Sequence, residues 1–211
     1  MDANGCTIDE VVTVNAPDDA SFTSNDFCES TVNTISGVAT PGGTFTIQSQ
    51  TGSGTATINA STGVLSNFSA GDQITIEYTT PSAGCQNSST QTVNVLPLDD
   101  ASFTSADFCE SSVNTISNVA TPGGTFSIQS QTGSGLVTIN GSTGVLSNYT
   151  AGDQVVIMYT TSGAGCQNSS TVTVNVTSLD DASFTTSDFC ESSVNTISGV
   201  TTPGGTFVIQ T

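Results

Sequence analysis

The chain repeats itself with a period of 81 residues. The segment PDDASFTSNDFCESTVNTIS begins at Pro17, and near-identical segments begin at Leu98 and Leu179. The same spacing separates two sets of cysteines, namely Cys28, Cys109 and Cys190, and Cys85 and Cys166. Because no residue is inserted or lost between the copies, we expect them to share one fold. An 81-residue unit is longer than most solenoid repeats and about the size of a small β-sandwich domain.

The phase of the repeat divides the chain into four parts. Residues 17–97 and 98–178 are predicted to be two complete Ig-like modules. Residues 179–211 correspond to the first strands of a following module, and residues 1–16 correspond to the terminal strand of a preceding one. We therefore expect the chain to be a window cut from a longer array.

Short apolar segments separated by turn residues predict seven strands in each copy. Ile74, Ile76 and Tyr78 alternate with polar residues, as in a half-buried strand, and ProGlyGly at 41–43 indicates a turn. No segment has a helical apolar period. In the first copy the predicted strands are Ala20–Thr23, Val32–Val38, Thr44–Ser49, Thr55–Asn59, Val64–Ser66, Gln73–Thr80 and Ser88–Val95. The pattern predicts an all-β fold, a tandem array of Ig-like seven-strand β-sandwich modules.

The chain has no lysine, arginine or histidine against 18 acidic residues, which gives a net charge of −18. It therefore lacks the cationic side chains that bind nucleic acids or anionic membranes. It also lacks the amine and imidazole groups on which most catalysis depends, so we expect no enzyme activity. No apolar run is long enough to insert into a membrane, and the first residues do not resemble a signal peptide. The expected partners are cations, glycans or other neutral surfaces, and neighbouring modules or further copies of the same protein.

Several segments of the repeat resemble one known family. DDASF, FCES, TPGGTF, TINxSTGVLS and GCQNSSTVTVNV are similar to the Ig-like tandem repeats of very large surface proteins of Bacteroidetes, including the SprB-type gliding-motility adhesins. The resemblance covers essentially the whole chain. It implies secretion by the type IX route and a place outside the cell, at the cell surface.

Acidic residues concentrate where one module is expected to meet the next. In a seven-strand sandwich, three of the turns lie at the same pole as the following linker. Carboxylates without a basic partner repel one another, and Ca²⁺, which takes 6 to 8 oxygen ligands, would relieve that repulsion. The alternative is an acidic, solvated loop that keeps a long polymer soluble. The candidate ligands are Asp26, Glu29, Asp72, Asp99 and Asp100 at the first junction, and Asp107, Glu110, Asp153, Asp180 and Asp181 at the second.

Six cysteines without histidine or a CxxC motif favour disulfides over a zinc site, and disulfides favour an oxidising, extracellular compartment. Three pairings are open. Pairing within modules, which is usual in tandem Ig-like domains, joins Cys28 to Cys85 and Cys109 to Cys166. Pairing between modules joins Cys28 to Cys166, because the expected topology places Cys28 and Cys85 at opposite poles. Pairing of sequence neighbours joins Cys6 to Cys28, Cys85 to Cys109 and Cys166 to Cys190.

Two functions are compatible with these features. The first is a structural spacer in a long extracellular adhesin or filament, whose repeats set length and stiffness in cell-surface adhesion or gliding. The second is a weak glycan-binding or surface-binding unit that acts by avidity. Phe22, Phe45 and Phe68 could form a glycan-stacking face, but a sandwich with so few aromatic residues needs them for its core. This favours the spacer.

Overall fold

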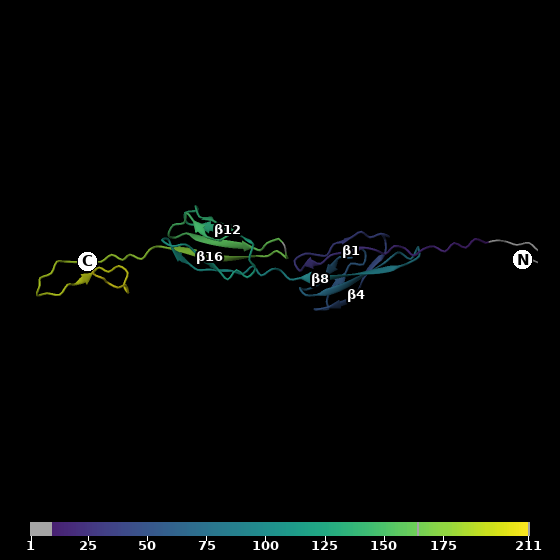
Figure 1. Cartoon of the computed structure of the whole chain (residues 1–211), viewed down its shortest axis with the longest axis horizontal. Coiled ribbons are helices and arrows are strands. Elements are labelled where there is room, and N and C mark those ends of the chain that lie inside the picture. The colour runs from purple at the N-terminus through teal and green to yellow at the C-terminus, as the bar shows by residue number, and fades with distance from the viewer. Residues whose placement is uncertain (1–9, 164, 211) are drawn as a thin grey trace, which may run out of the picture. The chain divides into compact units, whose positions relative to one another are not determined.

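The computed structural model describes residues 10–163 and 165–210, and these form two compact units (Figure 1). The first unit comprises residues 10–99 together with Gly163, Gly165 and Cys166. The second unit comprises residues 100–162 and 167–210. Every regular element in the described part of the chain is a strand. Within these residues there is no helix long and apolar enough to cross a membrane.

The two complete copies contain the same strands, shifted by 81 residues. The first copy contains β1 (Thr23–Ser24), β2 (Phe27–Cys28), β3 (Ile35–Ser36), β4 (Thr44–Thr51), β5 (Thr57–Ile58), β6 (Leu65–Ser66), β7 (Gln73–Thr79) and β8 (Ser88–Leu96). The second contains β9 (Thr104–Ser105), β10 (Phe108–Cys109), β11 (Ile116–Ser117), β12 (Thr125–Thr132), β13 (Thr138–Ile139), β14 (Leu146–Ser147), β15 (Gln154–Thr160) and β16 (Ser169–Thr177). Residues 179–210 contain β17 (Thr185–Thr186) and β18 (Ile197–Ser198).

Each complete copy is built on a four-stranded sheet. In the first copy its order is β2-β8-β7-β4, with β8 and β4 antiparallel to β7, and with β2 parallel to β8. Two short antiparallel pairs, β1 with β3 and β5 with β6, contribute to the second layer of the sandwich. The second copy repeats this topology as β10-β16-β15-β12, with the pairs β9–β11 and β13–β14. The predicted all-β sandwich is confirmed.

The core of the first unit lies under the alternating residues of the central strands. Ile74, Ile76 and Tyr78 on β7 are at most 1% exposed, so the predicted alternation is confirmed. Phe22 and Phe45 pack against Tyr78, with ring centroids 6.1 Å and 4.5 Å away. Buried rings cannot stack on a glycan, so these aromatic residues serve the core.

The short strands differ from the prediction in three ways. The strand expected at Ala20–Thr23 lies later, as β1 at Thr23–Ser24. The segment expected to be a strand at Val32–Val38 contains only β3, because buried Asn33 uses its side chain where a ladder would use the backbone. Its amide group donates to the Gly63 carbonyl at 2.9 Å and accepts from the Leu65 N–H at 2.8 Å. The sequence pattern also misses β2, since two residues are too few to show alternation.

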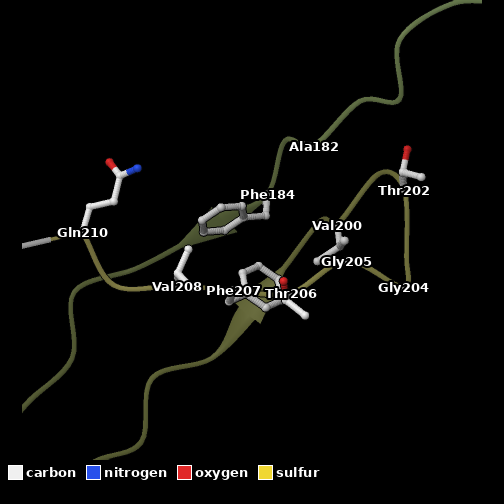
Figure 2. Close-up of a pocket in the computed structure, with 10 residues that line it drawn as sticks. All are labelled: Ala182, Phe184, Val200, Thr202, Gly204, Gly205, Thr206, Phe207, Val208 and Gln210. Atoms are coloured by element: carbon white, nitrogen blue, oxygen red, sulfur yellow. The ribbon is translucent and has the colours of Figure 1, made fainter. Parts of the chain in front are cut away.

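Residues 179–210 are an open version of the same sandwich. Phe184 and Phe207 contact each other edge to face at 5.1 Å, as Phe22 and Phe45 do at 5.6 Å. They are nevertheless 47% and 54% exposed, whereas Phe22 and Phe45 are at most 4% exposed. The hollow beside the Phe184–Phe207 pair (Figure 2) corresponds to the space that Tyr78 fills in the first copy. We therefore interpret the hollow as uncovered core and not as a ligand pocket.

Candidate functional site: a disulfide that joins two sequence copies

The buried carboxylate of Asp72 holds a turn of the first unit together. It accepts hydrogen bonds from the Ser53 N–H at 2.6 Å, the Ser53 hydroxyl at 2.7 Å and the Ser69 N–H at 2.8 Å. These hydrogen bonds, that of the Ser53 hydroxyl above all, lower the pKa of Asp72, and burial opposes them. The equivalent Asp153 accepts from Ser134 and Thr150, and the Ser134 amide contributes most to lowering its pKa. Both carboxylates therefore serve the fold.

Most of the other candidate calcium ligands accept hydrogen bonds from separate donors. Asp26 accepts from the backbone and side-chain amides of Asn94 at 2.7 and 3.1 Å, and Glu29 accepts from the Leu98 N–H at 3.0 Å. The Ser102 amide donates to Asp100 and is the main cause of its lowered pKa. The remaining candidates follow the same pattern or lie near a turn: Asp107 accepts from Asn175, Glu110 from Leu179 and Asp181 from Ser183, the Asp99 carboxylate lies beside Gly165, and Asp180 is exposed.

The calcium site expected from the sequence stays a prediction, since the structure describes each unit by itself. No three acidic or cysteine side chains come close enough together to hold a metal ion anywhere in residues 10–163 and 165–210. Amide and hydroxyl groups that lie close in space donate to most of these carboxylates one by one. Hydrogen bonds of this kind stabilise the charged form of each carboxylate.

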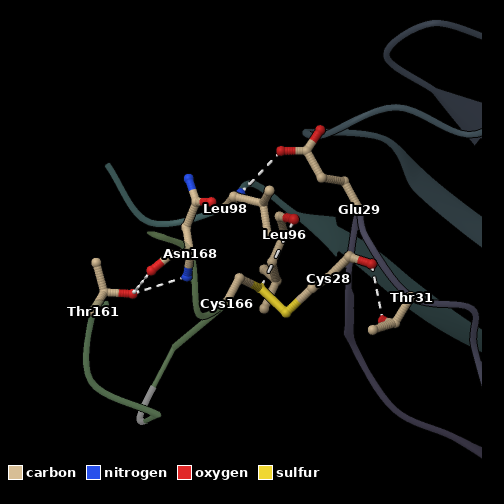
Figure 3. The surroundings of a disulfide bond; sticks show 8 residues. All are labelled: Cys28, Glu29, Thr31, Leu96, Leu98, Thr161, Cys166 and Asn168. Carbon is tan, nitrogen blue, oxygen red and sulfur yellow. Dashed lines mark hydrogen bonds between the residues drawn. A yellow bond between two sulfur atoms is a disulfide. The ribbon is translucent and has the colours of Figure 1, made fainter. Parts of the chain in front are cut away.

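A disulfide joins Cys28 of the first sequence copy to Cys166 of the second (Figure 3). Their Cα atoms are 5.4 Å apart, within the usual range for a disulfide, and 138 residues separate them in the sequence. Of the three pairings left open by the sequence, this is the one between modules. The other cysteines of the described residues, Cys85, Cys109 and Cys190, are free, and Cys6 lies outside the described residues.

Cys28 is positioned by the short parallel strand that the sequence pattern missed. β2 places Cys28 opposite Leu96, the last residue of β8. The Glu29 N–H donates to the Leu96 carbonyl at 2.9 Å, while the Glu29 carboxylate accepts from Leu98. The hydroxyl of Thr31 donates to the Cys28 carbonyl at 3.0 Å. Cys28 is thereby fixed to the chain segment that leaves the first sandwich.

Cys166 approaches the same segment from the turn between β15 and β16. The Asp99 N–H donates to the Cys166 carbonyl at 2.8 Å, and the Cys166 sulfur lies 3.9 Å from the Leu96 carbonyl oxygen. Thr161 and Asn168 close the base of this turn, with the Asn168 N–H donating to the Thr161 hydroxyl at 3.0 Å (Figure 3). Cys166 is 4% exposed. Each partner of the disulfide thus has its own backbone anchor on residues 96–99.

The same geometry explains why Cys28 and Cys85 are not paired. Cys28 lies beside the end of β8, whereas Cys85 precedes its first residue, Ser88. A nine-residue strand is about 30 Å long, and a disulfide needs Cα atoms within about 7 Å. Pairing within modules is therefore incompatible with this geometry. Pairing of sequence neighbours does not occur either, because Cys166 is bonded to Cys28 and Cys190 is free.

No protein-family model and no curated protein matches this chain. Among solved structures, extracellular cadherin domains 3–6 of protocadherin gamma B2 match 77% of this chain and 52% of their own, with 14% identity and a TM-score of 0.33. Domains EC1–2 of human protocadherin-24 match 77% of this chain and all of their own, with 15% identity and a TM-score of 0.31.

Drosophila N-cadherin EC1–4 matches 83% of this chain and 49% of its own, with 12% identity and a TM-score of 0.29. The matched region therefore spans about half of the gamma B2 and N-cadherin chains. At these TM-scores we draw no conclusion about family or function from the likeness.

Proposed function

We propose that this chain is a force-bearing spacer in a long extracellular adhesin or filament, without catalytic activity. The observation that carries the proposal is the disulfide between Cys28 and Cys166, which ties one repeat to the next. A bond of this kind persists in an oxidising compartment outside the cell. The sequence resemblance to SprB-type adhesins of Bacteroidetes favours the same role, in surface adhesion or gliding.

The disulfide changes the path of tension through the chain. When the chain is pulled from its ends, tension runs to Cys28, crosses the sulfur–sulfur bond and continues from Cys166. Residues 29–165 then carry none of it. They include most of both cores, from Phe45 to Val95 in the first and from Ala101 to Tyr159 in the second. Only the segments outside the loop, such as β1 in the first copy and β16 in the second, can be peeled away.

Single-molecule stretching of the whole chain tests this role. The loop between the two cysteines contains 138 residue steps, which correspond to about 450–500 Å of extended chain. We expect the oxidised chain to unfold without releasing this length, and the chain in dithiothreitol to release it. The double variant Cys28→Ser/Cys166→Ser is the matched control and should behave as the reduced chain does without reductant. Release of the full length by the oxidised wild-type chain contradicts the proposal.

A binding assay separates this role from that of a weak binding unit. Of the three aromatic residues that could have stacked on sugars, Phe22 and Phe45 are buried in the core, and Phe68 is half-buried against Phe27. We therefore expect the immobilised, folded chain to retain no polysaccharide on a glycan array and to leave cells unattached. Saturable binding by the isolated chain would show that the modules act as binding units.

A further inference from the structure

Cys109, which is free, lies in the same backbone setting as the bonded Cys28. It ends the parallel strand β10, opposite Thr177, as Cys28 ends β2 opposite Leu96. The Glu110 N–H donates to the Thr177 carbonyl at 2.9 Å, the same distance as its counterpart in the first copy. The Glu110 carboxylate accepts from the Leu179 N–H at 3.4 Å. The backbone contacts that position Cys28 at the end of its strand are thus repeated around Cys109.

Cys85, which is also free, lies in the same setting as the bonded Cys166. The Asp18 N–H donates to the Cys85 carbonyl at 2.8 Å, as Asp99 does to Cys166. The Cys85 sulfur lies 3.9 Å from the Asn15 carbonyl oxygen, and Asn15 is the repeat counterpart of Leu96. The contacts that hold Cys166 near residues 96–99 are therefore repeated between Cys85 and residues 15–18.

The free members differ from the bonded members in exposure. Cys109 is exposed where Cys28 is half-buried, and Cys85 is half-buried where Cys166 is buried. Each position is thus more covered in the copy that holds the bond. The bond between the equivalent residues Cys28 and Cys166 indicates what covers them, namely the complementary cysteine segment of another copy.

We propose that Cys109 and Cys85 are unpaired halves of this same disulfide and take further copies of the repeat as partners. Cys109 bonds to the turn cysteine of a following copy, and Cys85 bonds to the strand-end cysteine of a preceding copy. In each bond two thiols lose two protons and two electrons and form one disulfide. A low-molecular-weight disulfide such as oxidised glutathione accepts them and becomes two thiols. The proposal concerns cysteine pairing, and it stands whether or not the chain acts as a spacer.

If every repeat forms this bond, the disulfide-closed loops along the chain overlap one another. Every bond spans 138 residues while the repeat advances by 81, so successive disulfide loops overlap. A chain of many copies then contains no complete module outside a covalent loop. Such an array can unfold locally but cannot lengthen by the contour of a whole module.

A chain with one added copy tests the proposal. Residues 98–178 are duplicated in tandem, which places a turn cysteine 138 residues after Cys109, the separation found between Cys28 and Cys166. The protein is refolded with reduced and oxidised glutathione, alkylated and digested with thermolysin, because trypsin has no cleavage site. We expect two disulfides by mass spectrometry, Cys28–Cys166 and one from Cys109 to the added turn cysteine, with alkylation of Cys109 falling at least about tenfold relative to the 211-residue chain. The matched control, Cys109→Ser in the longer chain, should keep only the first disulfide.

An intact Cys28–Cys166 bond beside a fully alkylated Cys109 overturns the proposal, and so does pairing of Cys109 with Cys85. If the longer chain does not fold, the 211-residue chain supplies a second test. Cys85→Ser and Cys109→Ser variants are mixed in glutathione buffer, and crosslinks between the remaining Cys109 and Cys85 should exceed Cys109–Cys109 crosslinks severalfold. In an equal mixture of the variants, random pairing gives twice as much Cys109–Cys85 as Cys109–Cys109 crosslink, so a ratio no higher than that overturns the proposal.

Discussion

At the scale of single residues, two buried polar side chains take the place that a salt bridge has in other proteins. A chain without basic residues cannot neutralise a buried carboxylate with a cation. Asp72 is instead stabilised by three hydrogen bonds from Ser53 and Ser69, and Asn33 bridges two backbone groups. Hydrogen bonds to a charged acceptor are stronger than those between neutral groups. Asp72 should therefore contribute more to the stability of the first unit than Asn33 does.

Replacement of Asp72 by alanine should destabilise the first unit by about 2–4 kcal/mol, because it leaves the Ser53 and Ser69 amides without their acceptor. Chemical denaturation followed by circular dichroism measures the change. Glu77→Gln is the matched control, since this half-buried carboxylate lies on the neighbouring strand β7 and should change stability by less than about 0.5 kcal/mol. Equal effects of the two substitutions would show that the Asp72 hydrogen bonds contribute little.

The lowered pKa of Asp72 also predicts how stability depends on pH. Its carboxyl has a pKa below 3.8 in the folded state, so the unfolded chain binds the proton more readily. The stabilisation is therefore fully present above the unfolded value and is lost as the pH falls through the folded value. We expect denaturation midpoints of wild type and Asp72→Asn, measured from about pH 6 to about pH 2, to converge at the acid end. A constant difference across this range contradicts the assignment.

At the scale of elements, the close approach of one turn to the core explains the second glycine of the TPGGTF segment. The Gly43 N–H donates to the Tyr78 hydroxyl at 2.8 Å. A Cβ atom at Gly43 would overlap the Thr79 carbonyl oxygen and would lie 2.7 Å from the tyrosine ring. Side chains are excluded there because β7 passes directly beneath, so the glycine is required by packing.

Gly43→Ala should therefore lower the stability of the first unit by more than about 2 kcal/mol, as expected for overpacking against backbone. Gly205→Ala provides a control with the same sequence context. Gly205 is the counterpart of Gly43 in the partial copy, and a Cβ atom added there would meet no atom within 4 Å. Thermal melting of the two variants should show a large fall for Gly43→Ala and no change for Gly205→Ala. Similar melting temperatures would mean that β7 yields to the added methyl group.

At the scale of the whole molecule, a charge of −18 without a single basic side chain makes electrostatics uniformly repulsive. At a salt concentration of about 0.1 M, repulsion between exposed charges more than about 10 Å apart is largely screened. We expect the melting temperature to rise between about 10 and about 200 mM NaCl, whereas a protein stabilised by salt bridges would gain less or lose. A melting temperature that falls with salt would contradict this expectation.

Calcium should act only through this screening, since the described carboxylates do not gather into a site. At matched ionic strength, CaCl₂, MgCl₂ and NaCl should give the same melting temperature, and EDTA should not change it. Asp99→Asn and Asp100→Asn should leave the response to Ca²⁺ unaltered. A shift specific to Ca²⁺ that these substitutions abolish would contradict this expectation and confirm the junctional metal site predicted from the sequence.

The fold class and the central strands can be predicted from the sequence, because the patterns that indicate them are local and recur in every copy. The 81-residue period, the alternation of Ile74, Ile76 and Tyr78, and the turn glycines together predict the sandwich and its central strands. Alternation works here because one face of β7 is buried and the other is not. The absence of basic residues likewise determines that carboxylates are held without side-chain salt bridges.

Only the tertiary structure decided what each carboxylate and cysteine contacts. The acidic residues recur at fixed positions of the repeat, but they accept hydrogen bonds from different donors, some of them 68 or 69 positions away in the sequence, so spacing could not predict their contacts. The cysteine partner depended on β2, a two-residue parallel strand that sets Cys28 beside the end of β8. Contacts of this kind join residues 68 to 138 positions apart, and no local pattern in the sequence encodes them.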